Sequence, residues 1–126
     1  MRGVPKADPV KSWRSLAATY ADVHGALDSE LRREHDLSAV EFEVLERISG
    51  CDEGKVRMQE LSGVVHLTQS TCSRVVARLE DEGLAKRSMC ADDRRGIYAS
   101  VTEAGRERLA AAAPTYRRVI AAKLTV

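Results

Sequence analysis

The chain has 126 residues, a hydrophobic fraction of 44%, a charged fraction of 31% and a formal net charge of +1. This length suffices for one domain with its own core, and no apolar run approaches a bilayer span or a signal core, so we expect a cytoplasmic protein without a membrane partner. Three cysteines without paired spacing, Cys51, Cys72 and Cys90, argue against a secreted disulfide framework.

A long amphipathic helix is predicted for the first part of the chain. Asp8-Pro9 is a typical helix start, because Asp caps the free N–H groups and Pro fits the first helical position. We expect the helix to end near residues 34–36. Its apolar stripe recurs at steps of three and four residues, at Trp13, Leu16, Tyr20, Val23, Leu27 and Leu31.

Two shorter helices follow. Ser38 is the predicted cap of the first, which stops before Gly50 and carries an apolar face at Val40, Val44, Leu45 and Ile48. Residues 50–57 then form a loop whose last two residues, Val56-Arg57, we expect to pair with a later hairpin. The second short helix spans residues 58–65 and presents Met58, Leu61 and Val65 on one side.

The next helix has the marks of a DNA-reading helix. Thr68 caps it and Gly83 ends it. Cys72, Val75, Val76 and Leu79 form its buried stripe at the helical period. Small polar and basic side chains occupy the rest of its surface, namely Gln69, Ser70, Thr71, Ser73, Arg74, Ala77 and Arg78.

A β-hairpin is predicted for residues 84–102. Its tip is charged, Asp92-Asp93-Arg94-Arg95, and apolar residues alternate along the second strand at Ile97, Ala99 and Val101. After the hairpin, Thr102 caps an alanine-rich helix. We expect Pro114 to break or restart this helix, with residues 116–124 as a further helical piece.

Taken together, the fourth helix, the Asp-x-Arg hairpin tip and the Thr102-Glu103-x-Gly105 helix start resemble a MarR-family regulator over residues 9–113. The resemblance implies a mostly α fold with a small β-hairpin wing, in which a winged helix-turn-helix is flanked by N- and C-terminal dimerisation helices. We expect residues 1–36 to form the first dimerisation helix, 37–101 the DNA-binding domain and 102–126 the C-terminal dimerisation helices.

The expected function is sequence-specific binding of double-stranded DNA, with repression favoured over activation because a bound dimer blocks polymerase by occupancy. Helix residues Gln69, Ser70, Ser73 and Arg74 would reach base edges, with Thr68 and Thr71 beside them. Arg78 and Arg94 would contact phosphate. The resemblance aligns Arg95 with the arginine that the family inserts into the minor groove, and Asp93 with the acid that orients it.

A homodimer is expected, since the apolar stripe of the first helix is too long to leave in water and two half-sites need two-fold symmetry. Family members continue in further helix past the point matching Val126, so the resemblance implies a shortened interface in this chain. Members often release DNA when a small amphipathic ligand binds. Candidate residues for such a pocket are Trp13, Tyr20, His24 and Tyr116, which ordinary core packing would also explain.

Other function classes receive less support. Cys90 near the arginine-rich tip is a candidate redox site, which leaves a thiol-based sensor open. The histidines are scattered and no catalytic motif is present, so we expect neither a metal or other cofactor nor an enzyme. Residues 68–100 carry six Lys/Arg against five Asp/Glu. This near-neutral balance keeps a second reading open, in which the winged helix is a protein-interaction module.

Overall fold

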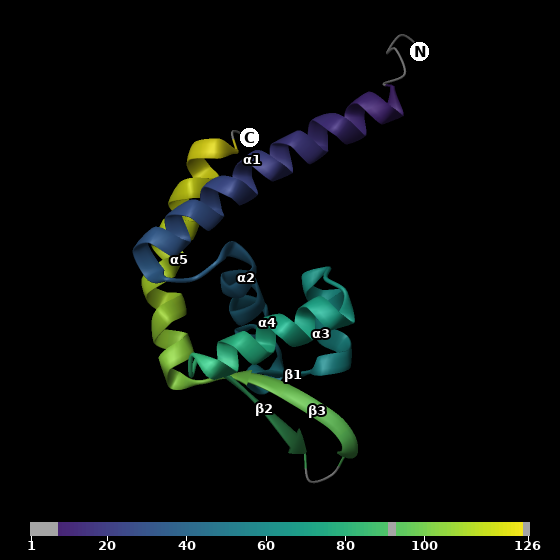
Figure 1. The fold of residues 1–126 in the computed structure, drawn as a ribbon, viewed down its shortest axis with the longest axis vertical. Helices are drawn as coiled ribbons and strands as arrows, with labels where there is room; N and C mark the ends of the chain where they lie inside the picture. Colours follow the sequence, from purple (N-terminus) through teal and green to yellow (C-terminus); the bar gives the residue numbers. More distant parts are fainter. Residues whose placement is uncertain (1–7, 91–92, 125–126) are drawn as a thin grey trace.

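The computed structural model of the protein describes residues 8–90 and 93–124, and for Cys90 and residues 93–95 it describes the backbone alone. The predicted fold class is confirmed: the chain is mostly helical, with a small antiparallel sheet (Figure 1). None of the helices in these ranges is both long and apolar enough to cross a membrane. The elements in chain order are α1 (Pro9–His35), α2 (Ala39–Ser49), a 3-10 turn (Asp52–Gly54), β1 (Lys55–Arg57), α3 (Met58–Val65), α4 (Gln69–Asp81), β2 (Ala85–Cys90), β3 (Asp93–Val101) and α5 (Glu103–Lys123).

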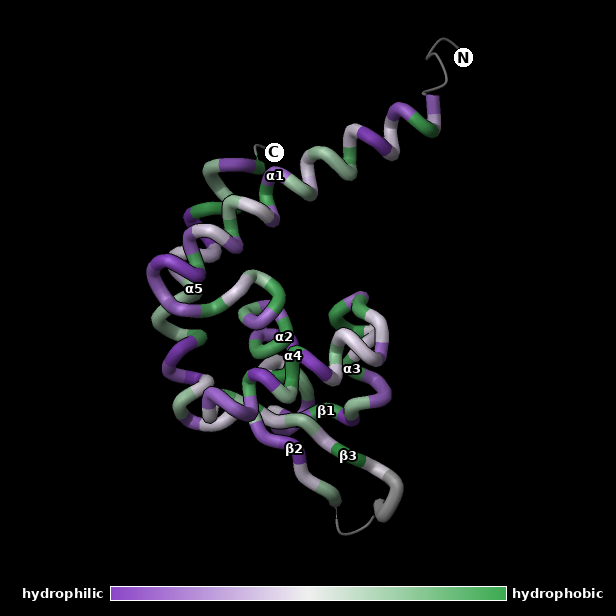
Figure 2. Tube along the Cα trace, in the orientation of Figure 1, coloured by the Kyte–Doolittle hydropathy of each residue, from purple (hydrophilic) through white to green (hydrophobic). Residues whose placement is uncertain are grey.

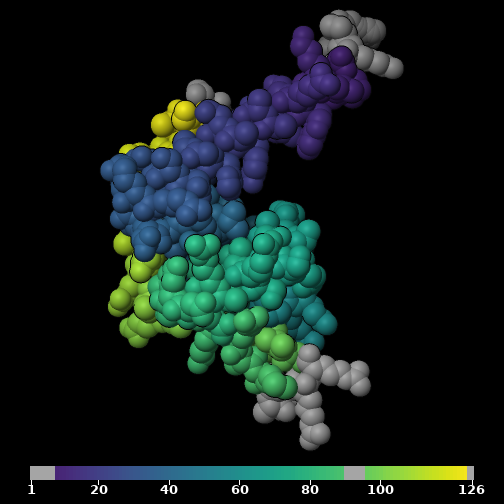
Figure 3. Space-filling view, viewed as in Figure 1, coloured from purple at the N-terminus to yellow at the C-terminus, as the bar shows by residue number. Residues whose placement is uncertain are grey.

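Helix α1 begins and ends where its sequence predicts. The Asp8 carboxylate accepts a hydrogen bond from the Val10 N–H at 3.0 Å, and Asp36 closes the helix in the left-handed conformation, with φ of 55°. Leu27 and Leu31 are buried against the rest of the protein. The outer part of α1 projects away from the body (Figures 1, 2 and 3), and its apolar side chains Val10, Trp13 and Leu16 are more than half exposed.

The core is centred on α2, which contacts α1, α4 and α5. Ser38 and Glu41 form a capping box, in which each side chain accepts a hydrogen bond from the backbone N–H of the other, at 2.9 and 2.8 Å. One face of α2 is buried, at Phe42, Val44, Leu45 and Ile48. Leu61 of α3 and Val76 and Leu79 of α4 belong to the same core. These contacts fix the helix-turn-helix pair α3–α4 on the body.

The sheet has the strand order β1-β3-β2, and the predicted pairing of Val56-Arg57 with the hairpin is confirmed. Ala99 and Val101 of β3 are buried beneath the helices, as the alternating pattern predicts. Ile97 is 49% exposed and faces Met89 across the hairpin, because β2 and β3 extend past the helical body at this point (Figure 1).

Helix α5 corrects one expectation. It is a single helix that runs through Pro114, so the predicted break at this proline is wrong. A proline inside a helix removes one N–H donor, but the turns on both sides of Pro114 pack against α1 and bury Leu109, Ala112, Thr115 and Val119. This tertiary packing outweighs the local loss. At the start of α5, Thr102 is the cap: its hydroxyl accepts from the Gly105 N–H at 3.1 Å and donates to the Gly83 carbonyl at 2.6 Å.

Candidate nucleic-acid interface

The recognition helix of the fold is α4, and its ends are determined by local chemistry. The Thr68 hydroxyl accepts from the Thr71 N–H at 3.2 Å and donates to the Thr71 hydroxyl at 2.9 Å. Gly83 adopts a φ of 76°, a left-handed conformation that glycine reaches without strain, and the chain turns there into β2. Both signals were readable in the sequence.

One side of α4 is buried and the opposite side meets solvent. Cys72, Val76 and Leu79 are inaccessible, while Val75 is half-buried. Ser70, Ser73 and Arg74 are exposed next to the N-terminal end of the helix. A guanidinium N–H of Arg74 donates to the Thr71 hydroxyl at 3.3 Å, which holds the arginine over the first turn. Short side chains beside one arginine allow the close approach that a helix makes in a major groove.

Gln69 lies on the same helix, and its amide is engaged within the protein. The amide nitrogen donates to the Gln59 carbonyl at 2.8 Å and to the Ser62 hydroxyl at 2.9 Å, both on α3. These bonds tie the first turn of α4 to α3. Gln69 could read a base through the same amide group only after giving up these two contacts.

Arg78 leans toward α2 and pairs with a residue that sequence reasoning missed. Its Nε lies 3.4 Å from a carboxylate oxygen of Glu41, whose side chain is only 8% exposed. Glu41 therefore serves α2 and α4 at once, because its other oxygen closes the capping box with Ser38. The motif Ser38-x-x-Glu41 was a readable signal for the cap. The pairing with Arg78 depends on tertiary structure and had no local signal.

The wing is anchored to α4 by another ion pair. Arg87 of β2 donates through Nε to one oxygen of the Glu80 carboxylate at 2.8 Å and through its backbone N–H to the other at 3.1 Å. These hydrogen bonds, chiefly that from the backbone, hold the pKa of Glu80 below its ordinary value. The predicted wing residues Asp93, Arg94 and Arg95 belong to β3, and their side chains lie outside the described residues.

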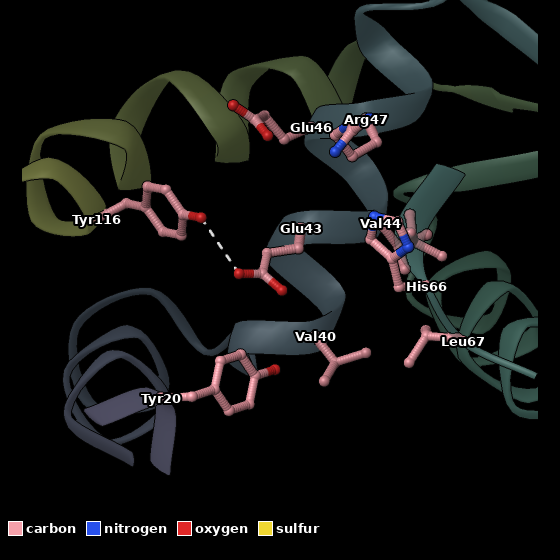
Figure 4. Close-up of a pocket in the computed structure, with 10 residues that line it drawn as sticks. Tyr20, Val40, Glu43, Val44, Glu46, Arg47, His66, Leu67 and Tyr116 are labelled. Atoms are coloured by element: carbon pink, nitrogen blue, oxygen red, sulfur yellow. Dashed lines mark hydrogen bonds between the residues drawn. The ribbon is translucent and has the colours of Figure 1, made fainter. Parts of the chain in front are cut away.

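A cavity of about 320 Å³ lies between α1, α2, α5 and the turn that joins α3 to α4 (Figure 4). The Tyr116 hydroxyl donates to a carboxylate oxygen of Glu43 at 3.1 Å. Burial, reinforced by this carboxylate, raises the pKa of Tyr116 to about 12. The hydroxyl is therefore neutral and remains a donor at physiological pH. The residues lining the cavity are Tyr20, Val40, Glu43, Val44, Glu46, Arg47, Val65, His66, Leu67 and Tyr116.

Two of the four aromatic and histidine residues predicted for a ligand pocket, Tyr20 and Tyr116, line this cavity. His24 stacks on the Tyr20 ring, with centroids 5.4 Å apart, and faces a different hollow beside Thr71 and Arg74 of α4. Trp13 lies two turns before Tyr20 on α1 and is 66% exposed. The predicted set is thus divided between the cavity, a stacking neighbour and the projecting part of α1.

The cysteines lie in separate places. Cys72 is buried in the core of the helix-turn-helix, and burial raises the pKa of its thiol, which makes it a poor nucleophile. Cys51 donates to the Arg47 carbonyl at 3.2 Å. The side chain of Cys90, the predicted redox candidate, is outside the described residues. Within the described part of the chain, no group of three or more His, Cys, Asp or Glu side chains could hold a metal ion.

Comparison with known proteins finds similarity to one family of regulators. The model of the MarR family matches residues 37–97, from the start of α2 to the second strand of the wing. The structure of Sco3205, a MarR family transcriptional regulator from Streptomyces coelicolor solved in complex with DNA, superposes with a TM-score of 0.85 at 28% identity, covering 98% of this chain and 77% of that one. The chain is similar to the MarR family across its winged helix-turn-helix.

Two further proteins similar to this chain are informative. The uncharacterized HTH-type transcriptional regulator YkoM from Bacillus subtilis is 29% identical over 99 residues, which is 77% of this chain. The chain spans 61% of the length of that curated relative. CouR from Rhodococcus jostii, solved with bound p-coumaroyl-CoA, superposes with a TM-score of 0.77 at 25% identity, covering 86% of this chain and 75% of that one.

Proposed function

We propose that this protein is a sequence-specific regulator of transcription that binds double-stranded DNA, and that it is not an enzyme. The observation that carries the proposal is the exposed face of α4, where Ser70, Ser73 and Arg74 stand beside an anchored wing. The similarity of the chain to Sco3205, which was solved with DNA, supports the same conclusion. Such a regulator acts in the cytoplasm, where its operator lies.

In this proposal the contacts divide between base edges and backbone. Ser70, Ser73 and Arg74 reach base edges in the major groove, with arginine suited to guanine. Gln69 also contacts a base edge where its hydrogen bonds to adenine are more favourable than the two hydrogen bonds to α3 that it gives up. Phosphate contacts come from the first turn of α4, at Thr68 and Thr71, and from Arg78 and Arg94. Arg95, oriented by Asp93, enters the minor groove.

The working unit is a homodimer that binds an operator with two similar half-sites. Support comes from the projecting part of α1, where Val10, Trp13, Leu16 and Tyr20 are all more than half exposed. Burying one large apolar side chain contributes ~1.5–3 kcal/mol, so four such residues form an apolar surface that a second copy would cover favourably. The N- and C-terminal helices would supply this interface, and a dimer seated on a promoter would repress by occupancy.

A small effector bound in the cavity would control the affinity for DNA. One wall of the cavity is formed by Val65, His66 and Leu67, the turn immediately before the cap of α4. A ligand that displaced this turn would change the position of the recognition helix relative to α1, and therefore the spacing of the two reading helices. CouR, solved with p-coumaroyl-CoA, is a relative with a bound small molecule.

Selection from a randomised duplex pool, at low and moderate salt, tests the proposed function. The proposal predicts enrichment of an inverted repeat whose affinity falls steeply with salt, because phosphate contacts release counterions. A sample that is dimeric yet enriches no sequence would contradict the proposal and favour a protein-interaction module, whose apolar interface is insensitive to salt.

A further inference from the structure

The cavity between α1, α2 and α5 has a charge that indicates which ligands it accepts. Glu43 and Glu46 lie one turn apart on α2 and both line the cavity, together with one arginine, Arg47. Among the described residues, neither carboxylate forms an ion pair with a basic side chain. Glu43, Glu46 and Arg47 together therefore give the lining a negative formal charge.

Glu43 lies in the middle of the cavity lining (Figure 4). Its side chain points into the space between the rings of Tyr116 and Tyr20 (Figure 4). One carboxylate oxygen, Oε2, accepts from the Tyr116 hydroxyl at 3.1 Å. Within the described part of the chain, the other oxygen has no protein donor, so Glu43 can accept further hydrogen bonds from a ligand.

The two tyrosine rings beside Glu43 are each held by a second ring. Tyr116 stacks on Phe42 with centroids 4.4 Å apart, and Tyr20 stacks on His24 at 5.4 Å. Rings that are positioned before binding lose little conformational entropy when a ligand enters. Aromatic faces attract cations, and a carboxylate between them adds a charge-assisted hydrogen bond. The remaining walls at Val40, Val44 and Leu67 are apolar.

We propose that this cavity binds a planar aromatic cation, such as an aryl amidine, through Glu43 and the two tyrosine rings, in preference to an aromatic acid. The inference rests on the proposed effector role of the cavity and adds the charge of the ligand. An acid in the same position would bring a second negative charge toward Glu43, and its nearest favourable partner on the lining would be Arg47.

Benzamidine and benzoate test this preference, because they are planar, similar in size and opposite in charge. Binding is measured by calorimetry on the full chain without DNA. We expect benzamidine to bind at least about tenfold more tightly than benzoate, the ratio that corresponds to one hydrogen bond to a charged group. Glu43→Gln should remove this preference, while its amide oxygen still accepts from Tyr116. Glu107→Gln, an exposed carboxylate on α5 that does not line the cavity, is the matched control and should leave it unchanged.

Three results would overturn the inference: tighter binding of benzoate, binding of neither compound, or an unchanged preference in Glu43→Gln. Arg47→Gln tests the positive charge of the lining separately, because it should weaken the binding of benzoate and leave benzamidine bound as in the wild type. DNA binding is measured on the same samples. A protein that selects an operator but prefers benzoate refutes only the charge of the ligand. A protein that binds benzamidine but enriches no DNA refutes the proposed function and leaves the ligand class standing.

Discussion

Gly105 lies where the start of α5 crosses the start of β2, and replacing it by alanine should destabilise the fold. A methyl group at this position would overlap the Leu84 carbonyl oxygen and lie 2.6 Å from Cγ1 of Val101. The Leu84 carbonyl belongs to the backbone and also accepts from the Thr102 N–H at 3.0 Å, so it cannot move without loss. The only relief is to shift α5 away from the sheet.

Overpacking of this kind destabilises a core by ~1–3 kcal/mol, and we take the upper end because the nearest atom, the Leu84 carbonyl oxygen, belongs to the backbone. Alanine also favours the helix over glycine by about 1 kcal/mol, so the net loss in the free energy of unfolding is about 2 kcal/mol. For a chain of this size, that corresponds to a fall in Tm of about 8 °C. Thermal unfolding followed by circular dichroism, at one fixed protein concentration, measures the shift.

Gly25→Ala is the matched control for this prediction. Gly25 is an exposed glycine within α1, and a methyl group there would meet no atom within 4 Å. The same substitution should therefore stabilise the protein by about 1 kcal/mol, which raises Tm by about 4 °C. Equal stability of Gly105→Ala and the wild type would refute the argument that the close approach at Leu84 requires glycine.

Three further predictions concern the cavity, the wing and the dimer. The pKa of Tyr116 is raised to about 12 from 10.0, so its stabilising contribution is complete below pH 10 and is lost as the pH rises through 12. The free energy of unfolding, measured with urea, should therefore fall less across this pH range in Tyr116→Phe than in the wild type. Identical pH profiles of the two proteins would contradict the shift. Glu80→Gln, which frees Arg87, should change the free energy of unfolding by less than about 1 kcal/mol and still weaken DNA binding, so unchanged affinity would show that the wing needs no anchor. Leu16→Glu places a charge on the exposed stripe of α1 and should produce a monomer in analytical ultracentrifugation, whereas an unaltered dimer would locate the interface elsewhere.

The sequence predicts the helices well where their ends are local. Asp8, Ser38, Thr68 and Thr102 each carry a cap whose partners lie within three residues, so spacing alone identifies them. The hairpin is also readable, because an alternating pattern follows a charged turn. These elements need no knowledge of the tertiary structure.

Pro114 shows where local reasoning fails. Its effect on backbone hydrogen bonding is correctly anticipated, but the outcome depends on how firmly α1 holds the neighbouring turns of α5. The candidate interface shows the same limit. Gln69 and Arg78 are identified as polar positions on α4, yet their partners, Ser62 and Glu41, lie on other helices. Periodicity reports which face is polar and carries no information on what that face contacts.

Arg74, on the exposed face of α4, is the residue whose replacement tests DNA reading by this helix. Affinity for the selected duplex is measured over a range of salt for the wild type, Arg74→Ala and Arg117→Ala, an exposed arginine on α5. We expect Arg74→Ala to lose ~1–3 kcal/mol of binding free energy and to relax the preference at one base position. Arg117→Ala should bind as the wild type does. Equal affinity and unchanged sequence preference in Arg74→Ala would contradict the claim that α4 reads the DNA.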